Sequence, residues 1–119
     1  PPIVILTSNR SRELHDALRR RCLYHWIDFP DPARAARIVR SRVPGASDPL
    51  ITSTTEFVGR ARELELDKPP GLAETIDWVS ALAALGVAEL SDGRVIDSVS
   101  ALAKTPDDRT ELVRALQSA

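Results

Sequence analysis

The tripeptide Pro30-Asp31-Pro32 is the feature that most constrains the fold of this chain. Each proline fixes φ near about −65° and removes a backbone N–H, so no regular strand or helix passes through this point. Asp31 followed by Pro32 is instead a helix-start signal, because the carboxylate caps the first turn and proline suits the first helical position. We therefore place a domain boundary between residues 30 and 31.

Residues 1–30 carry the pattern of a strand–helix–strand unit. Residues 3–7 form a run of aliphatic and β-branched side chains, typical of a strand buried on both faces of a parallel sheet. The next segment has apolar residues at helical spacing and predicts a helix from an N-cap at Ser11 to residue 21. Residues 23–29 form a second predicted strand. The expected fold of this part is α/β.

Residues 31–119 carry the period of helices throughout. Four segments with apolar residues at helical spacing are separated by Pro44-Gly45, by Pro69-Pro70-Gly71 and by Gly86. A last helix is expected after Thr105, which is followed by a proline and two acids. The sequence thus predicts a mostly helical chain, with an α/β part in residues 1–30 and an all-α part of four helices plus a C-terminal helix in residues 31–119.

The overall composition excludes several classes of protein. Hydrophobic residues make up 43% and charged residues 28%, which is typical of globular domains, and no apolar run is long enough to span a bilayer. With a single cysteine and a net charge of −1, we expect a cytoplasmic protein that binds neither membrane nor nucleic acid. Because the chain has no methionine and opens directly on an apolar run, we expect it to be part of a longer protein.

Asn9 is the first candidate for a chemical role. It follows the first predicted strand, at the edge where open α/β sheets place their ligand-binding residues, and its amide could orient a water molecule. The alternative is structural, since Thr7, Ser8 and Asn9 are residue types that satisfy backbone groups in turns.

The triple arginine at residues 19–21 is the second candidate. It ends a predicted helix, where cations are favoured by the helix dipole, so a solvated helix end explains it without any function. Consecutive helical residues point about 100° apart, however, so at least one guanidinium is expected to project away and reach a phosphate on a neighbouring molecule. Cys22 and the two histidines show no metal-ligand spacing, and we predict no metal site.

Three short segments occur in a fixed order: IVILTSNR at residues 3–10, LRRRC at 18–22 and IDFP at 27–30. Together they resemble the last third of an AAA+ ATPase core, and the MoxR type in particular. The resemblance implies that Asn9 is the sensor-1 residue facing the γ-phosphate of ATP and its attacking water. It also implies that Arg21, or else Arg20, is the arginine finger, and that residues 31–104 form the helical lid over the nucleotide.

The chain departs from that family at one position of the lid. The third lid helix of such ATPases usually begins with a sensor-2 arginine, whereas this chain has Glu74 there. A carboxylate cannot pair with a phosphate as arginine does, so the resemblance leaves two candidates for contact with the cofactor: Glu74 in a changed sensor-2 role, or Lys68 in its place. No phosphate-binding loop and no Mg²⁺-binding acidic strand end is present. ATP and Mg²⁺ are thus expected cofactors of the full-length protein, and the chain alone is expected neither to bind nor to hydrolyse ATP.

The resemblance implies a homo-oligomeric ring, a hexamer, that hydrolyses ATP at its subunit interfaces. Such ATPases remodel client proteins or mature metalloenzymes, with a von Willebrand factor A-domain protein as a candidate partner. Two alternatives stay open. One is a non-catalytic helical protein-interaction module whose arginines dock an acidic partner, and the other is a clamp-loader-type ATPase subunit on DNA, which the balanced charge does not favour.

Overall fold

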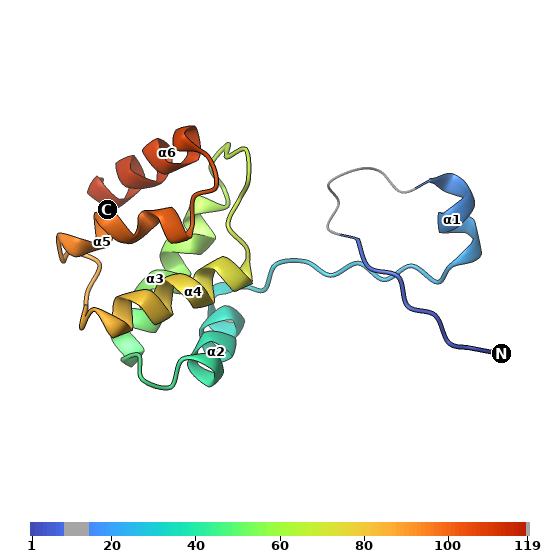
Figure 1. Cartoon of the computed structure of the whole chain (residues 1–119), viewed down its shortest axis with the longest axis horizontal. Coiled ribbons are helices and arrows are strands. Elements are labelled where there is room, and N and C mark those ends of the chain that lie inside the picture. The colour runs from blue at the N-terminus through green and yellow to red at the C-terminus, as the bar shows by residue number, and fades with distance from the viewer. Residues whose placement is uncertain (9–14, 119) are drawn as a thin grey trace.

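The computed structural model of this chain describes residues 1–8 and 15–118 (Figure 1). Its helices are α1 (Asp16–Arg21), α2 (Pro32–Arg42), α3 (Asp48–Ala61), α4 (Leu72–Ala84), α5 (Arg94–Ser98) and α6 (Pro106–Gln117), with a 3₁₀ turn η1 (Val99–Ala101) directly after α5. Figure 1 shows α2 to α6 packed into one helical domain, from which residues 1–8 and 15–28, here called the arm, extend to one side. None of the described helices is long and apolar enough to cross a membrane.

The predicted strand–helix–strand unit is wrong. The described residues are all-helical, without a strand or a sheet, and α1 is the one regular element of the arm among them. A strand needs a neighbouring strand for its hydrogen bonds and a surface on which to bury its side chains. Residues 3–7 and 23–29 have the composition of strands but gain no such burial, since Ile3 is 93% exposed and Leu23 is fully exposed.

Helix α1 also begins differently from the prediction. The expected N-cap, Ser11, lies outside the described residues. In the structure His15 caps the helix, and its Nδ1 accepts a hydrogen bond of 3.3 Å from the N–H of Ala17. The helix is only six residues long and buries none of them, so it receives no stabilisation from tertiary packing.

The predicted helix boundaries of the domain are confirmed where a capping residue marks them. Asp31 accepts a hydrogen bond of 2.9 Å from the N–H of Arg34, and Thr105 accepts one of 3.1 Å from that of Asp108. Gly86 follows the end of α4 with a positive φ of 74°, the left-handed conformation that favours glycine. These boundaries depend on local chemistry alone, which is why the sequence predicts them.

Two adjoining apolar clusters form the core of the domain, and α4 contributes to both. The larger is centred on Trp78, which is fully buried against Phe57 with ring centroids 5.7 Å apart. The indole N–H of Trp78 donates to the hydroxyl of Ser98 at 2.8 Å, so its polar group is satisfied inside the core. The smaller cluster joins α2, α3 and α4 through Val39, Val43, Ile51 and Val79.

Asp108 is the one buried charged residue among those described, with 2% of its surface exposed. Its two carboxylate oxygens accept hydrogen bonds of 2.9 Å each from the backbone N–H groups of Asp67 and Lys68. It also lies in the first turn of α6, where the helix dipole favours a negative charge. The carboxylate therefore fastens the α3–α4 connection, residues 62–71, to the last helix of the domain.

We predict that Asp108→Ala lowers the free energy of unfolding by about 2–3 kcal/mol, because it leaves two partly buried N–H groups without their charged acceptor. The matched control is Asp107→Ala, which removes an exposed first-turn acid that accepts no such bond and costs less than about 1 kcal/mol. Urea denaturation followed by circular dichroism measures both values. Equal losses in the two variants would contradict this role of Asp108.

Candidate functional site

The arginines at the end of α1 are an exposed cationic group of the arm. Arg19, Arg20 and Arg21 occupy the last turn of the helix, and among the described residues none of them forms an ion pair. Figure 1 places α1 on the arm, well away from the helical domain. The guanidinium groups of Arg20 and Arg21 are therefore available to an anion on another body. Asn9, the sensor-1 candidate, lies outside the described residues.

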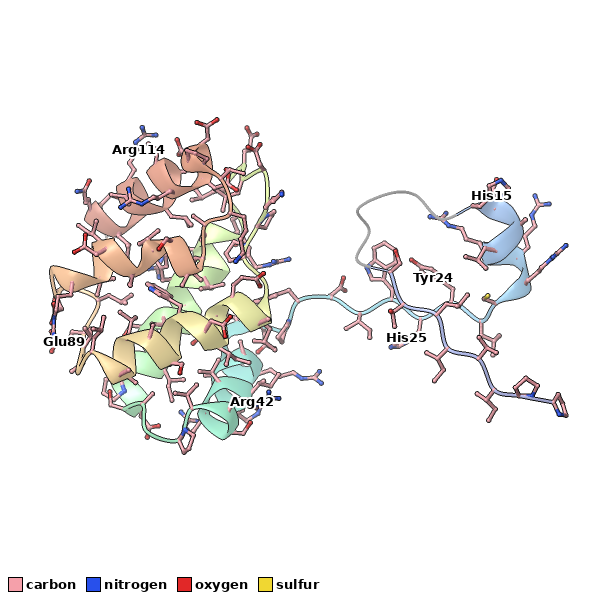
Figure 2. All side chains as sticks on the ribbon, in the orientation of Figure 1. His15, Tyr24, His25, Arg42, Glu89 and Arg114 are labelled. Carbon is pink, nitrogen blue, oxygen red and sulfur yellow. The ribbon has the colours of Figure 1, made fainter. Side chains whose placement is uncertain are left out.

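The rest of the arm is exposed as well. Nine of the eleven exposed large apolar side chains of the structure lie in it, which is an unusual concentration for a surface that stays in water. Figure 2 shows Tyr24 and His25 on this arm, away from the helices of the domain. The nine residues are Ile3, Val4, Ile5, Leu6, Leu18, Leu23, Tyr24, Trp26 and Ile27.

The α3–α4 connection is held at three points by charged side chains that bind its backbone. Asp108 accepts from two of its N–H groups, as described above. At its other end, Nη1 of Arg62 donates to the carbonyl of Pro70 at 2.7 Å, and Glu74 accepts from the N–H of Gly71 at 3.1 Å. Two consecutive prolines, Pro69 and Pro70, stiffen it further. The connection therefore presents its side chains from a fixed backbone.

Lys68 is one of the side chains of this connection that lie in solvent, and it carries a positive charge. Its backbone N–H is bound by Asp108, while its ammonium group is exposed and forms no ion pair within the described part of the chain. A lysine ammonium is a compact charge with three donors, suited to contact a phosphate. Of the two residues that the sequence suggested for binding the cofactor, Lys68 is the one with a free cationic group.

Glu74, the other cofactor-binding candidate, is engaged in capping α4. It is the third residue of the helix, and its carboxylate accepts the N–H of Gly71, the N-cap residue, which has no side chain of its own to cap with. A Cβ on residue 71 would lie 3.0 Å from this carboxylate oxygen, so glycine allows the close approach. The structure thus gives a physical reason for a carboxylate at this position, and the reason is local.

The two cationic groups do not meet within one chain. The arginines lie on α1, and Lys68 lies on the α3–α4 connection of the helical domain, which Figure 1 places well apart from α1. A single phosphate group therefore cannot contact both in this arrangement of the chain.

Two residues that matter for this site are missed by the sequence reasoning. The pairing of Asp108 with the backbone of Asp67 and Lys68 spans about 40 positions, and no local pattern predicts it. The second residue is Arg62, whose guanidinium carbon lies 4.2 Å from the centre of the Phe29 ring. Beside this contact is an open cavity of about 420 Å³ where the arm joins the domain, lined by Phe29, Pro30, Pro32, Glu56, Gly59, Arg60, Arg62 and Glu63.

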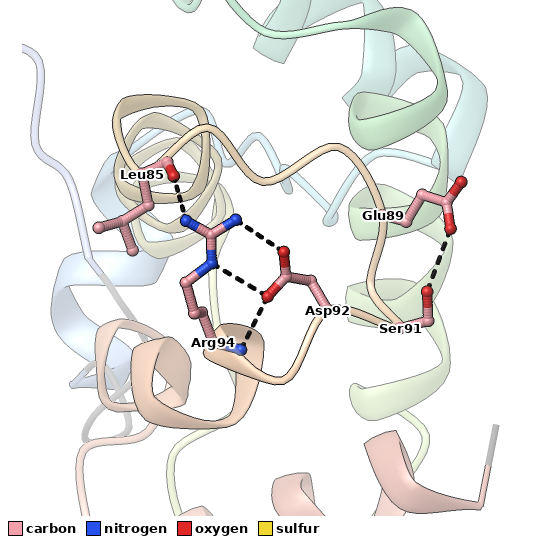
Figure 3. Close-up of polar contacts among 5 residues, drawn as sticks. All are labelled: Leu85, Glu89, Ser91, Asp92 and Arg94. Carbon is pink, nitrogen blue, oxygen red and sulfur yellow. Dashed lines mark hydrogen bonds and ion pairs between the residues drawn. The ribbon is translucent and has the colours of Figure 1, made fainter.

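Another polar cluster, drawn in Figure 3, joins the end of α4 to the start of α5. Nη2 and Nε of Arg94 contact the two carboxylate oxygens of Asp92 at 2.7 Å and 3.1 Å, and Nη1 donates to the carbonyl of Leu85 at 2.6 Å. Hydrogen bonds from the side chain and the backbone of Arg94 lower the pKa of Asp92 to about 2, and the same pairing raises the pKa of Arg94. Each of the three guanidinium nitrogens of Arg94 donates to an acceptor of the chain itself, so the cluster stabilises the turn.

No site for a metal emerges from residues 1–8 and 15–118, where no three His, Cys, Asp or Glu side chains come together in a suitable way. Comparison of the chain with protein-family models, with curated proteins and with solved structures found no match. The functional argument therefore depends on the residues and their geometry.

We predict that the Asp92 carboxyl titrates with a midpoint near pH 2 in the folded protein, below its ordinary value of 3.8. A lowered pKa in the folded state means that the pair stabilises the fold above about pH 4. This contribution is lost as the pH falls from 3.8 through 2. An NMR titration of the Asp92 side chain measures the midpoint, which returns toward 3.8 in Arg94→Met and stays near 2 in the control Arg109→Met. A midpoint that is the same in both variants would contradict the pairing.

Proposed function

We propose that this chain is the C-terminal part of a ring-forming AAA+ ATPase of the MoxR type. The helical domain is the lid that covers the nucleotide, and α1 supplies the arginine that acts on the nucleotide of a neighbouring subunit. The observation that carries the proposal is the separation of two free cationic groups, Lys68 and the α1 arginines, on two parts of one chain. Both groups suit phosphate, and two subunits that share one nucleotide would bring them together.

Lys68 is assigned to the lid side of that nucleotide. Its backbone is fixed by Asp108 and by the two prolines that follow it, so its ammonium would reach a phosphate without ordering a flexible loop first. It takes the place of the sensor-2 arginine of related ATPases, while Glu74 keeps α4 capped.

Arg21, with Arg20 as the second choice, is assigned to the neighbouring side. An arginine finger stabilises the charge that develops on the transferred phosphoryl group and accelerates hydrolysis by about 10³- to 10⁵-fold. Asn9 would orient the attacking water as the sensor-1 residue. ATP and Mg²⁺ would be held mainly by the nucleotide-binding part of the full-length protein, against which the apolar side chains of the arm would pack.

The biological role follows from the resemblance of the sequence to the MoxR type. We propose a cytoplasmic homo-oligomeric ring, a hexamer, that couples ATP hydrolysis to the remodelling of a client protein or to the maturation of a metalloenzyme. A protein with a von Willebrand factor A domain is the candidate partner for delivering that client.

The free arginines and the exposed apolar arm also fit a second candidate, a non-catalytic module that docks an acidic protein partner. The two functions differ in what the arginines do. In the ATPase they change the rate of hydrolysis, whereas in the module they change only the affinity for the partner.

We predict that in the full-length protein Arg21→Ala lowers the kcat for ATP hydrolysis by about 10³-fold or more and leaves the affinity for ATP within about twofold. Lys68→Ala is expected to raise the KM for ATP by about 10- to 100-fold, the loss of one charge-assisted contact. Arg19→Ala is the matched control on the same helix turn and is expected to keep the activity. Unchanged turnover in Arg21→Ala and in Arg20→Ala would favour the interaction module.

A mixing experiment tests whether the two groups act from different subunits. Subunits carrying Arg21→Ala retain Lys68, and subunits carrying Lys68→Ala retain Arg21, so a mixed ring contains interfaces with both groups intact. We predict that, at an ATP concentration well below the KM of the Lys68→Ala protein, mixing the two impaired variants restores ATP hydrolysis above the sum of the separate preparations. Activity equal to that sum would contradict action across the subunit interface.

A further inference from the structure

Arg62 contacts three separate segments of the chain at the point where the arm enters the helical domain. It is the C-cap residue of α3, and its backbone N–H donates to the carbonyl of Val58. Its guanidinium lies over the ring of Phe29, 4.2 Å from the ring centre, and its Nη1 donates to the carbonyl of Pro70 at 2.7 Å. One side chain thus contacts Phe29, the residue that follows the arm, and Pro70 near the start of α4, while its own backbone caps α3.

Phe29 is the first residue along the chain that packs against the core of the domain, since every described residue before it is exposed. It is followed at once by Pro30-Asp31-Pro32, and proline limits how this short segment bends. The direction in which the arm leaves the domain is therefore set close to Phe29, where the Arg62 contact lies.

Pro70 lies at the other side of the same guanidinium. It is fully packed in the domain, two residues after Lys68 and one residue before the N-cap of α4. A short path thus links Lys68 to the arm. It runs through the backbone of Pro69 and Pro70, the hydrogen bond between Pro70 and Arg62, and the contact of Arg62 with the ring of Phe29.

We propose that Arg62 is a positioning residue that fixes the direction of the arm and couples it to the connection carrying Lys68. Because the guanidinium bonds to the carbonyl of Pro70 and lies over the ring of Phe29, it would hold the connection that carries Lys68 and the arm in one relative orientation. A planar guanidinium suits this task because its face stacks on a ring while its edge donates hydrogen bonds, which a lysine ammonium does less well. The effect on hydrolysis rests on the proposed ATPase function, whereas the joint between arm and domain does not.

The joint is tested on the chain itself by the distance between two spin labels. One label is placed on Cys22, the single cysteine of the chain, which is exposed in the arm, and the other on Ser80→Cys at an exposed position of α4. The expected result is a narrow distance distribution that is lost in Arg62→Gln and in Phe29→Leu and kept in Phe29→Tyr, which retains a ring. Circular dichroism checks that each variant keeps its helices.

The matched control is Arg60→Gln, since Arg60 is exposed and lines the same cavity, whereas the guanidinium over the Phe29 ring is that of Arg62. It is expected to leave the distribution narrow. The proposal that Arg62 fixes the direction of the arm is overturned if the distance distribution is as narrow in Arg62→Gln as in the control. It is also overturned if the distribution is already broad in the wild-type chain.

The coupling is tested in the full-length ATPase. Arg62→Gln is expected to lower kcat by about 10- to 100-fold, as for other displacements of positioned groups, with an unchanged KM for ATP. Arg62→Lys is expected to restore part of the kcat. The double variant Arg62→Gln/Lys68→Ala is expected to lower kcat/KM by less than the product of the two single decreases. Broadened distances together with an unchanged kcat overturn the coupling. If the full-length protein does not hydrolyse ATP, the proposed function is overturned. The spin-label distances then still test whether Arg62 fixes the direction of the arm.

Discussion

The carboxylate of Asp108 is the interaction on which the functional side of this domain depends. A buried charge is costly unless it is fully hydrogen-bonded, and here two backbone N–H groups and the N-terminal turn of α6 satisfy it. In return the carboxylate holds a segment of irregular backbone against the last helix. Such a segment would otherwise move relative to the core, because loops are generally the least stable parts of a domain.

That restraint determines what the α3–α4 connection can do. With its backbone fixed at Asp67, Lys68, Pro70 and Gly71, the connection keeps one cation in solvent at a defined place. Glu74 and Arg62 both contribute to this restraint, because each of these charged groups binds a backbone group of the connection. A site built in this way contacts an anion at little cost in conformational entropy, which is the property that a lid over a nucleotide needs. The fixed connection and the free arginines of the arm are complementary halves of the proposed nucleotide contact.

The arm shows the limit of reading a fold from local pattern. Residues 3–7 and 23–29 are rich in β-branched and aliphatic side chains, and this composition predicts strands correctly only where a sheet exists to receive them. Among the described residues of the arm every side chain is exposed, and the one regular element is a short helix. The predicted sheet was therefore wrong for this structure, although the apolar composition still marks the arm as a surface suited to a partner.

The sequence by itself determined where the helices of the domain begin and end, because Asp31, Thr105 and Gly86 act on backbone groups within a few residues of themselves. Its resemblance to a known family also made Lys68, Arg20 and Arg21 candidates for contact with a phosphate. Only the tertiary structure decided that Glu74 caps α4, that Asp108 holds the backbone of Lys68, and that Arg62 joins Phe29 to Pro70. The physical reason is the separation along the sequence between the groups that interact. A cap or a turn is a contact between near neighbours, whereas a buried carboxylate paired 40 positions away exists only after the apolar faces of α3, α4 and α6 have packed together.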